Sequence, residues 1–310
     1  MLSKIQIVLL LLLIIMGGLI LKNHLYPKAF MMEGFEIDKQ SENFKFANQP
    51  AQIYDKFYCG IYDDLMLDSK QMGYILGQIL KINTIAAPLE RNQEITALDV
   101  GSGTGHYVSA MNQNGIKALG IDLSPNMVAL AQKNYPDYTY VQGNAENTMD
   151  FQPSSFNLIT CLYYTLYYME DKHRFLANCY QWLKPGGTLV VHVVNRKKFS
   201  PIVVASDPLL IISPQNYSKE RITESVAEFN NFKYKAKFSY EEGKNEGKFD
   251  EYFKFHKKNG ARQNEHRLKM IGIKPFISMA KGLGFSLSDT IDLGKCGYDY
   301  QYLLVLRKTR

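Results

Sequence analysis

Cysteine is scarce in this sequence. The 310 residues include only four cysteines, namely Cys59, Cys161, Cys179 and Cys296. They are widely spaced and form no CxxC pair or Cys/His cluster, so the pattern offers no zinc site and we predict no bound metal. We expect free thiols, which are typical of proteins in a reducing compartment.

A strong excess of one charge is also missing. The net charge is +6, and residues 231–270, with eleven basic and six acidic residues, contribute five of these charges. Strongly basic nucleic-acid binding proteins carry a far larger excess, so we expect no nucleic-acid partner. Apolar residues make up 46% of the chain, which is enough for a packed core and excludes a disordered protein.

One apolar run opens the chain. The seventeen positions from Ile5 to Leu21 are apolar or glycine apart from one glutamine, and a lysine flanks each end. This length is at the short end of what crosses a bilayer as a helix, and no small-residue cleavage site follows it. We therefore predict a single-pass transmembrane anchor at residues 1–22, a linker at 23–50, and a globular domain at 51–310 that faces the cytosol.

A glycine-rich turn follows the first predicted strand of the globular part. Residues 94–100 have strand character and lead into the turn Gly101–Gly105, after which a helix can form. Glycines are needed where the backbone turns tightly and a ligand approaches the peptide groups. The next strand ends at Asp122, twenty-three residues after Asp99. An acid at such a strand end can accept both hydroxyls of a ribose.

Strands and helices then alternate along the chain. This order predicts an α/β fold with a doubly wound, mostly parallel sheet of seven strands and ligands at the carboxyl ends of those strands. The five strands after the first two are predicted at residues 138–142, 156–162, 188–194, 285–293 and 300–306.

In combination, these motifs resemble the class I S-adenosylmethionine (SAM)-dependent methyltransferases that act on small molecules. Residues 97–105 look like the first motif of that family, and residues 183–187 look like its turn before the fifth strand. Asn144-Ala145 stands where the family usually has Asp-Ala beside the adenine, and an amide oxygen can still accept from the adenine amino group. The resemblance implies SAM as the methyl donor and a small-molecule or lipid-like acceptor.

The resemblance and the residue pattern together give a set of expected contacts with the donor. The set combines the glycine turn, the strand-end acids, the residues after each strand end and two tyrosines near the start of the domain. It consists of Tyr54, Tyr58, Asp99, Gly101, Ser102, Gly103, Asp122, Leu123, Met127, Asn144, Ala145 and Leu162.

Two other readings of these motifs stay open. A nicotinamide-dependent Rossmann oxidoreductase also uses a glycine turn, but its GxGxxG spacing serves a pyrophosphate, whereas this chain has GxGxG and SAM has no phosphate. A non-catalytic SAM-binding membrane adaptor would share the fold but lack turnover. Binding of SAM separates the first alternative from the rest, and formation of S-adenosylhomocysteine separates an enzyme from an adaptor.

Tyrosines gather in two places where an acceptor could bind. Tyr54, Tyr58 and Tyr62 recur every fourth residue, which puts them on one face of a predicted helix, either as core or as a lid over the sulfonium. Four more tyrosines follow the fourth strand, at the edge where the acceptor should lie. Of these, Tyr164 is our candidate for a catalytic contact.

A long insertion, residues 196–270, separates the fifth strand from the closing helix. Aromatic and charged residues alternate along it, and we predict an antiparallel meander with strands at 232–240, 249–256 and 262–270 that roofs the acceptor pocket. Resemblance to related methyltransferases places an Asn-Glu-His segment of this kind near the acceptor. His266 is therefore our candidate general base, unless it points outward on a solvated strand face.

Overall fold

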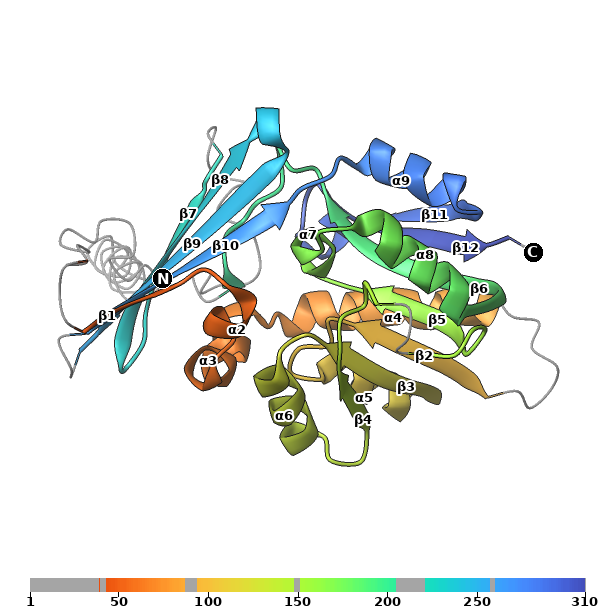
Figure 1. The fold of residues 1–310 in the computed structure, drawn as a ribbon, viewed down its shortest axis with the longest axis horizontal. Coiled ribbons are helices and arrows are strands. Elements are labelled where there is room, and N and C mark those ends of the chain that lie inside the picture. The colour runs from red at the N-terminus through yellow and green to blue at the C-terminus, as the bar shows by residue number, and fades with distance from the viewer. Residues whose placement is uncertain are drawn as a thin grey trace, which may run out of the picture.

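The computed structural model describes residue 39 and residues 43–86, 94–147, 151–204, 221–256 and 260–309. These residues form two β-sheets, one covered by helices and one extending away from it (Figure 1). The predicted anchor at residues 1–22 lies outside the described residues. Among the residues that are described, no helix is both long and apolar enough to cross a membrane.

The larger sheet has seven strands in the order β11-β12-β6-β5-β2-β3-β4. All neighbours pair in parallel except β12, which is antiparallel to both β6 and β11. The predicted seven-stranded, mostly parallel sheet is thus confirmed. Its strands are β2 (Ile95–Val100), β3 (Ile116–Asp122), β4 (Thr139–Gln142), β5 (Phe156–Cys161), β6 (Leu183–Val194), β11 (Phe285–Asp292) and β12 (Gln301–Lys308).

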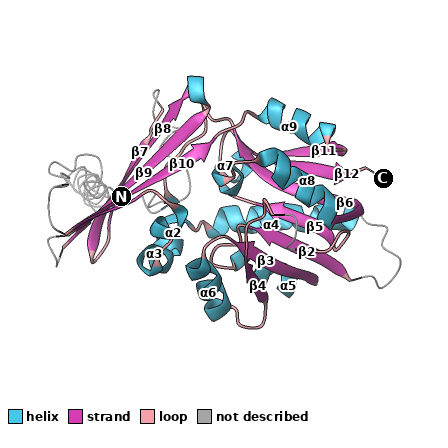
Figure 2. Ribbon diagram, in the orientation of Figure 1, coloured by secondary structure: helices cyan, strands magenta, loops and turns pink. Residues whose placement is uncertain are grey.

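Helices cover both faces of this sheet, as Figure 2 shows. Side chains of α8 (Lys172–Trp182) and α9 (Ile273–Gly282) pack in one core cluster with Leu98 of β2. The adjacent Ala97 belongs to a second cluster, on the other face. Successive strand residues point to opposite faces, which explains why the strands are apolar throughout. The second cluster includes residues of α4 (Ser69–Ala86), α5 (His106–Gln113) and α6 (Pro125–Asn134).

The insertion forms most of the smaller sheet, which we call the roof sheet. Its order is β1-β10-β9-β8-β7. The predicted meander is confirmed by β8, β9 and β10, while β7 and β1 were not predicted. Strand β1 falls inside the predicted linker and pairs in parallel with β10. The bounds are β1 (Phe44–Ala47), β7 (Glu224–Glu228), β8 (Phe232–Glu241), β9 (Glu246–Phe255) and β10 (Ala261–Lys269), with the turns η3 (Glu242–Lys244) in this sheet and η4 (Leu293–Cys296) before β12.

Two short helices lie between the sheets (Figure 1). These are α2 (Pro50–Ile53) and α3 (Lys56–Met66), and the chain bends between them at Tyr54 and Asp55. The prediction that Tyr54 shares one continuous helix with Tyr58 and Tyr62 is therefore wrong. The bend is stabilised because the Asp55 side chain caps α3 by accepting from the backbone N–H of Tyr58 at 3.0 Å.

Candidate active site

The glycine turn joins β2 to α5 at the carboxyl edge of the large sheet. Gly103 has φ of +52°, and a Cβ added there would enter open space. Gly101 has φ of +72°, but its Cβ would collide with the side chain of Thr165. We expected both glycines to leave room for a donor. The structure supports that role only for Gly103, because Gly101 is needed for the close approach of Thr165 on α7 (Thr165–Tyr168).

Asp122 organises this turn from the end of β3. One carboxylate oxygen accepts from the backbone N–H of Gly103 at 2.9 Å, and the other accepts from that of Ser124 at 2.8 Å. Burial raises the pKa of this carboxyl, although both hydrogen bonds act in the opposite direction. Each carboxylate oxygen has a second lone pair, so Asp122 can hold the turn and still accept from a ligand hydroxyl.

Two polar groups beneath the turn are buried. Asp99 accepts from the Thr160 hydroxyl at 2.7 Å, and burial raises the pKa of its carboxyl to about 7. The Ser102 hydroxyl is buried without a hydrogen-bond partner in the described structure. A Cβ added at Gly120 would lie 2.5 Å from this oxygen, so the hydroxyl packs against β3. The open space at Gly103, beside the carboxylate of Asp122, indicates that the turn fits a donor with hydrogen-bonding groups.

The remaining expected donor contacts divide between accessible and buried positions. Leu123, next to Asp122, is one of the few exposed large apolar residues, and Asn144 is partly accessible. Ala145 and Met127 are buried behind them. Leu162 packs in the core cluster with Tyr107 and Val190. Leu123 and Asn144 are thus the members of this set that a ligand can reach most directly.

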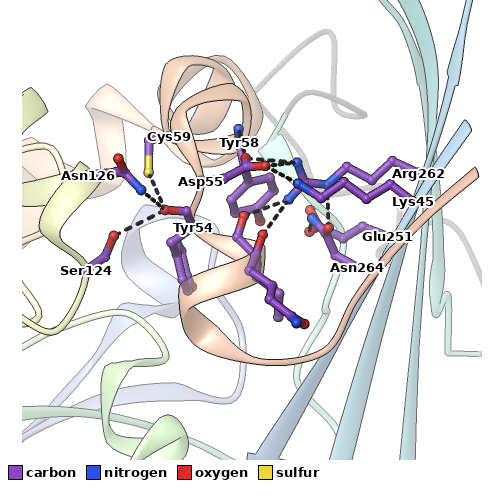
Figure 3. Close-up of polar contacts among 12 residues, drawn as sticks. Lys45, Tyr54, Asp55, Tyr58, Cys59, Ser124, Asn126, Glu251, Arg262 and Asn264 are labelled. Carbon is purple, nitrogen blue, oxygen red and sulfur yellow. Dashed lines mark hydrogen bonds and ion pairs between the residues drawn. The ribbon is translucent and has the colours of Figure 1, made fainter. Parts of the chain in front are cut away.

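The bend between α2 and α3 links the two sheets, as Figure 3 shows. Toward the large sheet, the Tyr54 carbonyl accepts from Asn126 Nδ2 at 2.8 Å and from Ser124 Oγ at 3.3 Å. Toward the roof sheet, Asp55 pairs with Arg262 at 2.8 Å and with Lys45 at 2.5 Å. The bend is therefore hydrogen-bonded both to the start of α6, next to Asp122, and to the roof sheet.

Four tyrosine rings meet beside this bend. Tyr54 lies 5.5 Å from Tyr58, 6.3 Å from Tyr62 and 6.3 Å from Tyr168, measured between ring centroids. Tyr58 is buried, whereas Tyr54, Tyr62 and Tyr168 keep accessible surface. Burial raises the pKa of all four phenols. The rings stay uncharged at neutral pH and can face a cation through their π electrons.

His266 points into this cluster. It is 2% exposed, whereas the side chain of neighbouring Arg267 is 69% exposed. The outward alternative considered above is therefore wrong. His266 Nδ1 lies 2.7 Å from the Tyr168 hydroxyl, and its Nε2 lies 2.7 Å from a carboxylate oxygen of Glu251 on β9. Both ring nitrogens are thus engaged by other side chains.

The structure does not bring Tyr164 and His266 together. Tyr164 stacks on His192, with 6.3 Å between centroids, and packs against Phe199. His192 is buried in β6, its Nε2 lies 3.0 Å from Gln301, and burial lowers the pKa of the imidazole to about 4. The tyrosine that meets His266 is Tyr168.

The model of the family called methyltransferase domain matches residues 98–191, from β2 to β6. This segment is similar to the methyltransferase domains of that family. It contains the glycine turn, Asp122 and the residues around Asn144, and the match decides against a nicotinamide-dependent reading of the turn. The SAM donor expected from the sequence is confirmed for this domain.

Curated proteins similar to this segment include methyltransferases named for ubiquinone biosynthesis and for demethylmenaquinone. The chain is 34% identical to the ubiquinone biosynthesis O-methyltransferase of Methylococcus capsulatus over 38% of this chain and 52% of that protein. It is 37% identical to the demethylmenaquinone methyltransferase of Chlorobaculum tepidum over 32% of this chain and 40% of that protein. The chain thus spans about half the length of the curated relatives it matches.

Solved structures extend the likeness beyond the methyltransferase domain itself. A SAM-dependent methyltransferase from Clostridium acetobutylicum superposes with a TM-score of 0.59 over 82% of this chain and 98% of that chain. The two sequences are 15% identical, so the comparison concerns the fold alone. It supports the class I methyltransferase architecture for the chain.

Sequence reasoning missed a contact that fixes α3 to the methyltransferase domain. Asp63 accepts from the Thr104 hydroxyl at 2.7 Å and lies 2.8 Å from Nε2 of His106, whose Nδ1 meets Tyr135 at 2.7 Å. The only available signal was an acid within a predicted helix, and acids are common on helix surfaces. Only the fold places Asp63 against the glycine turn.

Proposed function

We propose that this chain is a SAM-dependent methyltransferase with a small-molecule or lipid-like acceptor. The observation that carries the proposal is the glycine turn 101–105, which we call the donor turn, where open space at Gly103 adjoins the strand-end acid Asp122. SAM supplies an activated methyl group when bound. The protein then has to position the two reactants and manage a proton.

Named residues would hold the donor in this arrangement. Asp122 would accept from the ribose hydroxyls, and Asn144 and Leu123 would contact the adenine. Ser102 and the backbone around Gly103 would face the methionine moiety, with Asp99 attracting its positive charge. Tyr54 and Tyr58 would lie near the sulfonium, where neutral aromatic rings favour a cation.

The acceptor is proposed from the aromatic surroundings of the bend. Tyr54, Tyr62 and Tyr168 keep accessible surface next to the donor turn, and aromatic walls with few polar groups are typical of small-molecule sites. The names of the quinone methyltransferases that match the chain favour a ring-bearing, lipid-soluble acceptor.

Binding and turnover test this function separately. We expect SAM to bind the purified protein in calorimetry and to be converted to S-adenosylhomocysteine when membrane lipid extract and labelled SAM are added. Absence of SAM binding would contradict the proposal outright. Binding without conversion, with any extract, would favour the non-catalytic adaptor.

We further propose that residues 5–21 anchor the chain in a membrane as a single helix, with the methyltransferase domain in the cytosol. The apolar composition of this segment supports the proposal. The full chain should stay in membranes washed with alkaline carbonate, and a variant lacking residues 1–30 should be released and still bind SAM. Release of the full chain by carbonate would argue against an anchor.

A further inference from the structure

We propose that Tyr168, His266 and Glu251 form a proton relay, and that the acceptor is a hydroxyl or comparably weak acid that loses its proton to Tyr168 during methyl transfer. The inference rests on the proposed methyltransferase function and adds the acceptor class and two residues, Tyr168 and Glu251. Our sequence prediction placed His266 itself against the acceptor.

Accessibility decides which of the three residues meets the acceptor. His266 is 2% exposed and Glu251 is fully buried, whereas Tyr168 keeps accessible surface. Both nitrogens of His266 are already hydrogen-bonded, so neither is free for a substrate. Tyr168 is thus the member that can touch a bound molecule, and His266 and Glu251 act through it.

Glu251 determines where the protons lie. Its carboxylate meets the Tyr234 hydroxyl at 2.8 Å, Asn264 Nδ2 at 3.0 Å and His266 Nε2 at 2.7 Å. An ionised carboxylate only accepts, so Nε2 of His266 must carry a proton. In the neutral imidazole, Nδ1 then has a free lone pair and accepts from the Tyr168 hydroxyl. The resting chain is Tyr168 donating to His266 and His266 donating to Glu251.

The surroundings keep Glu251 ionised. Burial raises the pKa of this carboxyl, but the charge of His266 in its protonated form and the hydrogen bonds from His266, Asn264 and Tyr234 together lower it below its ordinary value. When His266 is neutral, the three hydrogen bonds remain. The nearby cation on β10 is Arg262, which is paired with Asp55. Aromatic rings fill the rest of the surroundings of His266, namely Tyr54, Tyr58 and Phe249.

The relay step balances in atoms and charge. The acceptor oxygen forms a bond to the methyl carbon as the carbon–sulfur bond of SAM breaks and its electron pair returns to sulfur. The acceptor proton moves to the Tyr168 oxygen while the Tyr168 proton moves to Nδ1 of His266. The positive charge lost from the sulfonium reappears on the imidazolium, where Glu251 stabilises it at 2.7 Å. The proton leaves to water after the products.

Nitrogen-15 NMR of the full chain tests the resting state without any acceptor. The His266 signals can be assigned by their loss in His266→Gln. We expect Nε2 protonated and Nδ1 bare at pH 7.5. An Nδ1 that is also protonated could take no further proton and would overturn the relay.

Turnover tests the step itself. With labelled SAM and membrane lipid extract, Tyr168→Phe should lower the turnover rate by about 10²–10⁴-fold, the range for general-base catalysis, with SAM affinity unchanged. Tyr240→Phe is the matched control, because among the described residues the hydroxyl of this roof-sheet tyrosine meets only Asn245, and the variant should keep full turnover.

The pH profile separates proton transfer from a structural role. Without Tyr168 the acceptor must ionise in solution, so the rate of Tyr168→Phe should rise about tenfold per pH unit, while the wild-type rate rises less. Glu251→Gln, which keeps the side-chain volume, should show the same steeper profile. Turnover of Tyr168→Phe equal to wild type would refute the relay and leave the methyltransferase function intact. No turnover by the wild type would refute that function, and the relay with it.

Discussion

The two sheets bury different kinds of side chain. From Leu189 to Val194, β6 of the large sheet buries only aliphatic residues and His192. In the roof sheet, β10 buries five polar residues in a row, from Arg262 to His266. The large sheet presents polar groups at its strand ends, and the roof sheet holds them within its strands. The donor site of the large sheet is thus built from turns at strand ends, whereas the roof sheet is held by hydrogen bonds between side chains of neighbouring strands.

This difference changes what a substitution should cost. When an apolar side chain in a core is shortened, the free energy of unfolding falls with the volume removed. When one member of a buried polar network is lost, several other groups are left unsatisfied. Substitutions in the roof sheet should therefore reduce stability more than donor affinity. Substitutions at the donor turn should reduce donor affinity more than stability.

The largest effect is expected at Glu251. Glu251→Leu leaves His266, Tyr234 and Asn264 without their shared acceptor, and each buried donor that loses its partner typically costs about 1–3 kcal/mol. Thermal unfolding and hydrogen exchange of β9 and β10 would measure it. Glu241→Leu, on the exposed end of β8, should change stability by no more than about 0.5 kcal/mol. Equal costs for the two variants would show that the buried network of Glu251 contributes no more to stability than an exposed ion pair of the same sheet.

Gly103→Val should abolish donor binding in a folded protein. The new side chain enters the open space at the turn, and we expect SAM affinity to fall at least about 100-fold, or about 2.8 kcal/mol. Gly115→Val is the control, since Gly115 has a similar positive φ of +80° and open surroundings at the exposed start of β3. Both glycines have a positive φ, so valine strains the backbone at either position, and equal SAM affinities of the two variants would show that Gly103 is not at the donor.

Asp122→Asn should weaken SAM binding by about 1.5–3 kcal/mol, because hydrogen bonds from a ligand to a charged group are lost. Calorimetry measures the change. Asp292→Asn provides the comparison, since Asp292 also ends a strand and accepts from a backbone N–H, that of Gly294 at 2.8 Å, but belongs to the opposite edge of the sheet. An unchanged affinity for Asp122→Asn would exclude the ribose contact.

The smallest effect is a pH dependence carried by Asp99. With its pKa raised to about 7 by burial, the carboxyl is protonated below that pH, so affinity for cationic SAM should increase as pH rises through 7. If binding lowers this pKa by one unit, the gain is about 1.4 kcal/mol, or tenfold. Asp99→Asn should bind SAM equally at pH 6 and 8, and a pH dependence that persists in this variant would assign it to another group.

Stability should respond to Asp99 in the opposite direction. The unfolded chain releases the Asp99 proton in the ordinary range of an aspartate, whereas the folded chain keeps it up to about 7. Between these values the folded state binds more protons, so stability without donor falls as pH rises. Asp99→Asn should remove that fall, which thermal unfolding across this pH range would detect.

The difference in buried side chains also explains why the sequence predicted the large sheet better than the roof sheet. Buried parallel strands are short apolar runs between glycine turns, and their order follows from the alternation with helices. The partner of His266 was not predictable, because it depends on the register that pairs Asn264 with Glu251 across β9 and β10. The bend at Tyr54 was also missed, since tyrosines every fourth residue continue a helical pattern through it. Strand β1 has only four residues, and its parallel partner lies more than 200 residues away.

Strand β1 can transmit a pulling force from the N-terminal side of the chain to the bend between α2 and α3. It is an edge strand held by four parallel pairs to β10, and Tyr54 follows its last residue, Ala47, by only seven positions. A pull on the chain before Phe44 would load these pairs in shear, along the strand, and pass to the bend through α2. Tension or restraint at the N-terminal side therefore acts first on the roof sheet and on the tyrosines of the bend, and reaches the donor turn through α2 and α3, by way of Tyr54 and Asp63.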